Sequence, residues 1–131
     1  MTMPHKRTRS IRWGHELLGE MLGDPSVDEA IKAAARTLLM TYPSPAAVSQ
    51  WIDDHAAAIA PAAAQAIVEG ADLWARLRRS GQGSDKTRRS LVFAERHFPE
   101  PWMAQMLATN PIDGIRGWLM QEDHRAEPKI R

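Results

Sequence analysis

The residues of this chain that are best spaced for binding chemistry are the cations between positions 76 and 89. Three of them end one predicted helix and three begin the next: Arg76, Arg78, Arg79, Lys86, Arg88 and Arg89. A short turn between the two helices would bring these charges to one edge, where they could hold nucleic-acid phosphates. A solvated face is the alternative, because the helix dipole also favours arginines at a helix C-terminus.

The turn between these helices invites comparison with a helix-turn-helix, in which a Gly-containing turn joins two helices. Three observations weaken the comparison. The net charge is only +1, the connection Ser80-Gly81-Gln82-Gly83-Ser84 is longer than the usual turn, and no set of base-reading side chains stands out after it. Nucleic-acid binding is therefore the second hypothesis.

Residue types that usually perform catalysis or bind metals form no recognisable site. The five histidines are scattered, without HExxH spacing, and no GxSxG, Walker A or GxGxxG motif occurs. The nearest clusters are Asp53-Asp54-His55 and His15 with Glu16 and Glu20, but neighbours on a helix point in different directions. With no cysteine available as a nucleophile or ligand, we predict no catalytic, cofactor-binding or metal-binding residue, and no enzyme.

Strand signals are nearly absent, whereas Ala, Leu, Met, Glu and Arg dominate, so the sequence predicts an all-α fold. A Ser-x-x-Glu capping box at Ser26 and the cap-and-proline pairs Ser44-Pro45 and Asn110-Pro111 mark helix starts. We expect six or seven short helices, over about residues 8–22, 26–41, 45–60, 61–79, 84–97, 101–109 and 111–124.

One break in the helical pattern occurs twice, as Tyr42-Pro43-Ser44-Pro45 and as Phe98-Pro99-Glu100-Pro101, at an offset of 98 − 42 = 56. The offset predicts two similar three-helix units, 8–60 and 61–109, within one domain spanning 1–131. An extra C-terminal helix at 110–124 and a flexible tail at 125–131 follow. The alternative is that the two proline pairs arose independently.

The tryptophans mostly lie at helical apolar spacings, which is typical of core anchors. Trp102 is the exception, because it follows a proline at a helix start. There an exposed aromatic ring could serve a partner.

No apolar run approaches the roughly 20 residues that span a bilayer, and the N-terminus has no apolar leader segment. We expect a soluble cytoplasmic protein without membrane contact. The first predicted helix has a wide apolar stripe, so a homodimer through that helix is a further hypothesis.

The N-terminal part of the chain contains, in this order, Met1-Thr2-Met3-Pro4, Arg7-Thr8-Arg9, Leu17-Leu18, Ala35-Arg36, Tyr42-Pro43-Ser44 and Trp51. This pattern resembles an uncharacterised family of small proteobacterial proteins known only by a locus-tag name. The resemblance covers about residues 1–55. It implies a bacterial, cytoplasmic source and supplies no catalytic or binding residue.

These observations favour a non-enzymatic protein–protein interaction module, a small bacterial accessory, regulatory or inhibitory protein that binds another protein. The alternative is a nucleic-acid-binding regulator that uses the Arg76–Arg89 edge.

Overall fold

Five helices form the regular structure of the computed structural model, which describes residues 4–54 and 59–98. They are α1 (Pro4–Leu22), α2 (Glu29–Leu39), α3 (Pro45–Asp53), α4 (Pro61–Ser80) and α5 (Asp85–Arg96). The all-α prediction is confirmed, since these residues contain no strand. The sixth and seventh predicted helices, at 101–109 and 111–124, lie outside the described residues.

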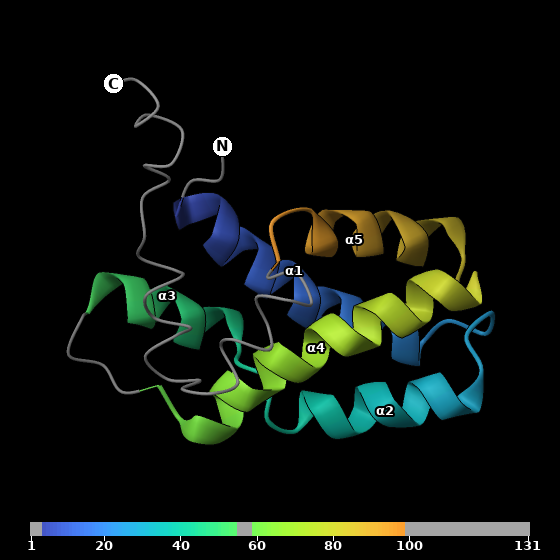
Figure 1. Cartoon of the computed structure of the whole chain (residues 1–131), viewed down its shortest axis with the longest axis horizontal. Coiled ribbons are helices and arrows are strands. Elements are labelled where there is room, and N and C mark those ends of the chain that lie inside the picture. Colours follow the sequence, from blue (N-terminus) through green and yellow to red (C-terminus); the bar gives the residue numbers. More distant parts are fainter. Residues whose placement is uncertain (1–3, 55–58, 99–131) are drawn as a thin grey trace, which may run out of the picture.

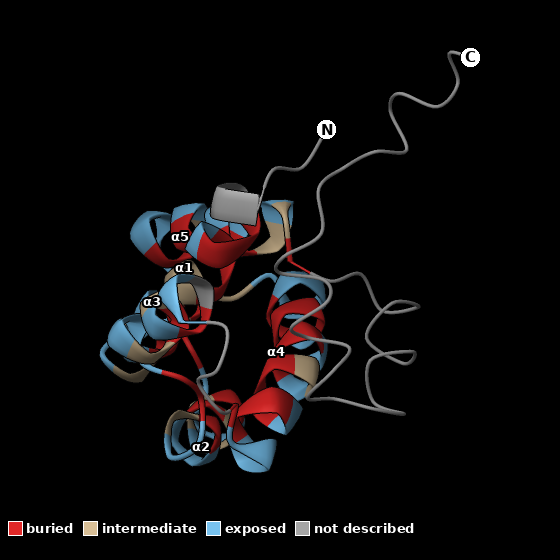
Figure 2. Ribbon diagram, turned by 90° about the vertical axis from the view of Figure 1, so that its left-hand side faces the viewer, coloured by how far each residue is buried: buried red, intermediate tan, exposed pale blue. Residues whose placement is uncertain are grey.

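Helix α1 is the centre of the packing, since it contacts α5, α2 and α3 (Figure 1). Helix α4 crosses the bundle and packs against α2 and α5. Burial is concentrated on the helix faces that point inward (Figure 2). The predicted apolar stripe of α1 is confirmed there, because Ile11, Leu17, Leu18 and Met21 are fully buried.

Three predicted helix starts are confirmed, and two need correction. Ser44 and Ser84 cap α3 and α5, and Pro61 opens α4. Helix α1, however, begins at Pro4 instead of Thr8, since proline is well tolerated in a first helical turn.

The predicted capping box at Ser26 is wrong. The Ser26 backbone N–H donates to the Asp24 carboxylate at 2.8 Å, which folds this segment into a side-chain-capped turn before α2. Asp28 then takes the N-cap position, and its Oδ1 accepts the Ile31 N–H at 2.9 Å.

An aromatic cluster fills the middle of the bundle. Trp74 is 1% exposed, and its ring centroid lies 6.4 Å from that of Tyr42 and 5.8 Å from that of Phe98. The Tyr42 hydroxyl donates to the Ile11 carbonyl at 2.7 Å. The residues of the two proline breaks therefore meet on one tryptophan of α4. Trp51 is also buried, as a core anchor should be.

The glycine-containing connection between α4 and α5 is held in place by side chains. Gly81 has φ 70°, the left-handed conformation that ends many helices. The Gln82 carboxamide then bonds Asp28 twice, accepting its backbone N–H at 2.7 Å and donating to its carboxylate at 3.0 Å. These bonds fix the start of α5 beside the start of α2.

No helix of the described residues is both long and apolar enough to cross a bilayer.

Candidate interaction surface

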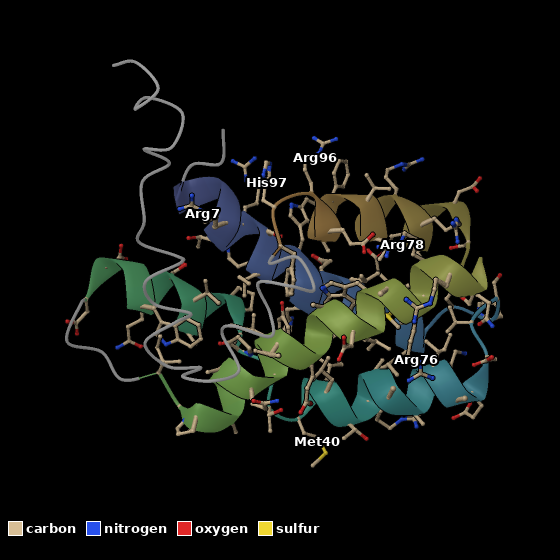
Figure 3. The ribbon with its side chains drawn as sticks, viewed as in Figure 1. Arg7, Met40, Arg76, Arg78, Arg96 and His97 are labelled. Atoms are coloured by element: carbon tan, nitrogen blue, oxygen red, sulfur yellow. The ribbon has the colours of Figure 1, made fainter. Side chains whose placement is uncertain are left out.

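The predicted basic edge is divided between different sides of α4 and α5. Arg76 points toward α2, whereas Arg78 points toward α5 (Figure 3). Arg78 forms an ion pair with Glu95 of α5. Arg88 donates to the Gln82 carbonyl at 2.9 Å, so its guanidinium supports the turn. Two of the six predicted cations, Arg78 and Arg88, therefore bond other residues of the same chain.

The other predicted site residues lie in different surroundings. Arg79 is exposed in the last turn of α4. Lys86 lines an open groove of about 600 Å³ together with Glu16 and Glu20 of α1. Arg89 is exposed on α5. Trp102 lies outside the described residues.

A second surface, which the sequence did not predict, lies along α1 and α5. We call it the α1–α5 surface, and it comprises two residues of α1 and four of α5: Arg9, Trp13, Arg89, Val92, Phe93 and Arg96. The Trp13 and Phe93 ring centroids are 5.3 Å apart. Val92 is 54% exposed and Phe93 38% exposed, so two large apolar side chains of one helix face solvent.

Arginine side chains lie beside Phe93 and Trp13. A groove of about 240 Å³ opens between the helices, lined by Arg9, Ser10, Trp13, Phe93, Arg96 and His97. Arg96 and His97 both lie at the outer edge of the bundle (Figure 3). Among the described residues, no acidic side chain lines this groove. The α1–α5 surface therefore combines an apolar centre with a cationic rim.

Two hydrogen bonds, one buried and one partly buried, hold α5 against α1 beneath this surface. The Ser10 hydroxyl donates to the Ala94 carbonyl, and the Ser90 hydroxyl donates to Glu20 at 2.6 Å. Leu91 and Ala94 are buried on the same inner face. Because the inner face of α5 is fixed, Val92 and Phe93 are held outward and the surface is formed before any partner binds.

The sequence signal for the α1–α5 surface was present but ambiguous. Leu91-Val92-Phe93-Ala94 is a continuous apolar run, which on its own indicates a buried segment. Helical geometry permits only one side of such a run to face the core. A helical projection with Thr87, Leu91 and Ala94 inward would have placed Val92 and Phe93 outside.

Asp24 is the described carboxylate with the most strongly perturbed pKa. It is 5% exposed and accepts the Thr87 hydroxyl at 2.6 Å and the backbone N–H groups of Ser84 and Ser26, each at 2.8 Å. These hydrogen bonds, that of Thr87 foremost, hold the pKa of Asp24 far below its ordinary value. Because two of these bonds join the turn after α1 to the start of α5, Asp24 has a structural role.

The described residues contain no group of three or more His, Asp or Glu side chains arranged to hold a metal ion. Searches against protein-family models, curated proteins and solved structures returned no match for this chain.

Proposed function

We propose that this chain is a non-enzymatic protein–protein interaction module that docks an acidic segment of another protein on the α1–α5 surface. One observation carries the proposal: Phe93 is exposed beside Trp13, and the groove that these two rings line also holds Arg9 and Arg96 and, within the described part of the chain, no acid. Val92 adds a second exposed apolar side chain on the same helix. Aromatic and arginine side chains are the types that contribute most at protein interfaces. The cationic rim would select acidic partners and accelerate their association.

A nucleic-acid-binding regulator is the second candidate. Exposed aromatic rings next to cations also suit the stacking of unpaired bases. We rank it lower because Arg78 and Arg88, both members of the predicted edge, bond Glu95 and Gln82 of the same chain.

We further propose that the bundle arose from two similar units at the offset of 56. The N-cap residues Asp28 and Ser84 differ by 84 − 28 = 56, so α2 corresponds to α5 and α1 to α4. If each helix is replaced by its counterpart in the other unit, the contact between α1 and α5 becomes a contact between α4 and α2. In the same way, the contact between α1 and α2 becomes a contact between α4 and α5. All four packings occur, which supports an approximate twofold relation.

Affinity capture from a nuclease-treated bacterial lysate tests the protein-binding proposal. We expect a protein partner that is retained by the wild type and lost by the double variant Val92→Glu/Arg96→Glu. Met40→Glu is the matched control, because Met40 is an apolar residue 82% exposed at the end of α2, away from the surface. The control variant should retain the partner.

Two results would reject the proposal. A partner captured equally by all three proteins would place the docking surface elsewhere. Capture that is seen in a parallel untreated lysate but disappears from every sample after nuclease treatment would instead favour the nucleic-acid alternative.

A further inference from the structure

The opposite side of the bundle carries a groove between α2 and α4. We call it the α2–α4 groove; it has a volume of about 410 Å³ and is lined by Ala33, Ala34, Thr37, Leu38, Glu69, Asp72, Leu73 and Arg76. Its floor is formed by small side chains and by the buried Leu38 and Leu73. Glu69 and Asp72 are exposed on its rim.

The α2–α4 groove occupies the position that corresponds to the α1–α5 surface at the offset of 56. Position 37 corresponds to 93, and position 69 corresponds to 13. In the α1/α5 packing these positions hold the ring pair of Phe93 and Trp13. In the α2/α4 packing they hold Thr37 and Glu69. The second packing therefore lacks the aromatic pair that fills the first.

The two faces also carry complementary charges. Arg89 and Arg96 flank Val92 and Phe93 on α5, whereas the exposed carboxylates of the groove lie one helical turn apart on α4. These two carboxylates, Glu69 and Asp72, would face an incoming cationic surface.

Arg76, the cation of the groove, also acts on a carboxylate outside it. The pKa of Asp28 is lowered mainly by the hydrogen bond from Gln82, and the charge of Arg76 lowers it further. The groove itself holds the two carboxylates of Glu69 and Asp72 against the single cation of Arg76, so its net charge is negative.

We infer that the α1–α5 surface of one copy docks into the α2–α4 groove of a second copy. Val92 and the exposed part of Phe93 enter the groove, and Arg89 and Arg96 meet Glu69 and Asp72. This inference rests on the proposed function, because the copy that docks would cover the partner-binding surface. Self-association thus regulates access to that surface.

The geometry of the chain makes this contact head-to-tail. Helix α5 lies along one edge of the bundle and α2 along the opposite edge (Figure 1). In a dimer held by such a contact, one α1–α5 surface and one α2–α4 groove stay unoccupied and can bind further copies. The assembly therefore grows with concentration until a ring closes or a partner protein occupies the free α1–α5 surface.

Complementary variants of the full chain test the inference by sedimentation velocity. The surface variant is Val92→Glu/Arg96→Glu, and the groove variant is Glu69→Lys/Asp72→Lys. All four positions are exposed, so both proteins should keep the helical circular dichroism spectrum of the wild type. Asp53→Lys, a charge reversal at an exposed position of α3, is the control for altered net charge.

We expect the wild type and Asp53→Lys to associate with rising concentration. Each double variant alone should lose roughly tenfold or more in association constant, because like charges then face each other across the contact.

An equimolar mixture of the two double variants should associate again. The glutamates introduced into the surface variant then meet the lysines introduced into the groove variant, and these opposite charges attract. The unaltered surface of the groove variant also fits the unaltered groove of the surface variant. Heterodimers should therefore appear in the mixture at concentrations where each variant alone is monomeric.

Three outcomes would overturn the inference: a wild type that stays monomeric at high concentration, double variants that associate like the wild type, or a mixture that stays monomeric. The groove variant separates this inference from the proposed function. If the groove variant still captures a protein partner while the wild type is monomeric, the docking proposal stands and self-association is rejected.

Discussion

At Gly14, α1 packs directly against the aromatic cluster. A Cβ atom added at Gly14 would overlap the Tyr42 hydroxyl oxygen and would lie 3.0 Å from the Trp74 ring. The Tyr42 hydroxyl is tied to the Ile11 carbonyl, so the ring has little freedom to move. Glycine is therefore required here by space, since α1 is a regular helix at this position.

Gly14→Ala should lower the free energy of unfolding by about 1–3 kcal/mol, the usual cost of overpacking. This loss should exceed the gain of up to about 1 kcal/mol that alanine brings to a helix interior. Gly19→Ala, in the same helix with no atom near the added Cβ, should show only that gain. Urea unfolding of both variants checks the pair, and equal stabilisation by both would contradict the packing described here.

Asp24→Asn should destabilise the fold by about 1–2 kcal/mol, because an amide group can no longer accept all the bonds that the carboxylate accepts. The Oδ2 atom of Asp24 receives both the Ser84 N–H and the Thr87 hydroxyl. An amide N–H placed at that position would face the Ser84 N–H, another donor. Urea unfolding at neutral pH measures the loss, and an unchanged midpoint would contradict it.

The lowered pKa of Asp24 also predicts a dependence of stability on pH. In the unfolded chain the aspartate takes up its proton at about pH 3.8, whereas folded Asp24 does so only at lower pH. The stabilisation is thus complete above about pH 4 and is lost as the pH falls below it. Urea midpoints measured on both sides of this pH should show a smaller acid-induced loss for Asp24→Asn than for the wild type. Equal losses would contradict this role of Asp24.

At the scale of helices, much of the described fold was predictable, because its signals are local. Ser44-Pro45, Pro61 and Ser84 each specify a helix start through groups that lie within one turn. The start of α2 was not predictable in this way. Ser26 does not cap α2, because its backbone N–H donates to the Asp24 carboxylate. The other hydrogen-bond partners of Asp24, Ser84 and Thr87, lie far along the chain.

The pairing of helices predicts that neither half of the chain folds alone. Helix α1 packs most extensively against α5, and α2 packs against α4, so both contacts join the two halves. A fragment of residues 1–56 should show no cooperative thermal transition by circular dichroism, and mixing it with residues 57–131 should restore one. A cooperative transition in the isolated 1–56 fragment would contradict this interdependence.

At the scale of the molecule, the candidate site was harder to predict than the fold. The sequence indicated that Arg78 and Arg88 belong to a basic edge, but their partners Glu95 and Gln82 become neighbours only through the turn and the packing of α5. Similarly, the exposure of Val92 and Phe93 depends on which side of α5 meets α1. Such three-dimensional relations leave no short motif in the sequence.

Photo-crosslinking from the α1–α5 surface tests its docking role most directly. A photoreactive amino acid would replace Val92 in one sample and Met40 in a control, and each protein would be irradiated in a nuclease-treated bacterial lysate. We predict an adduct with another protein, through an acidic segment, from position 92 and none from position 40. Adducts from position 40 alone, or none from either position, would contradict the assignment of the α1–α5 surface as the docking site.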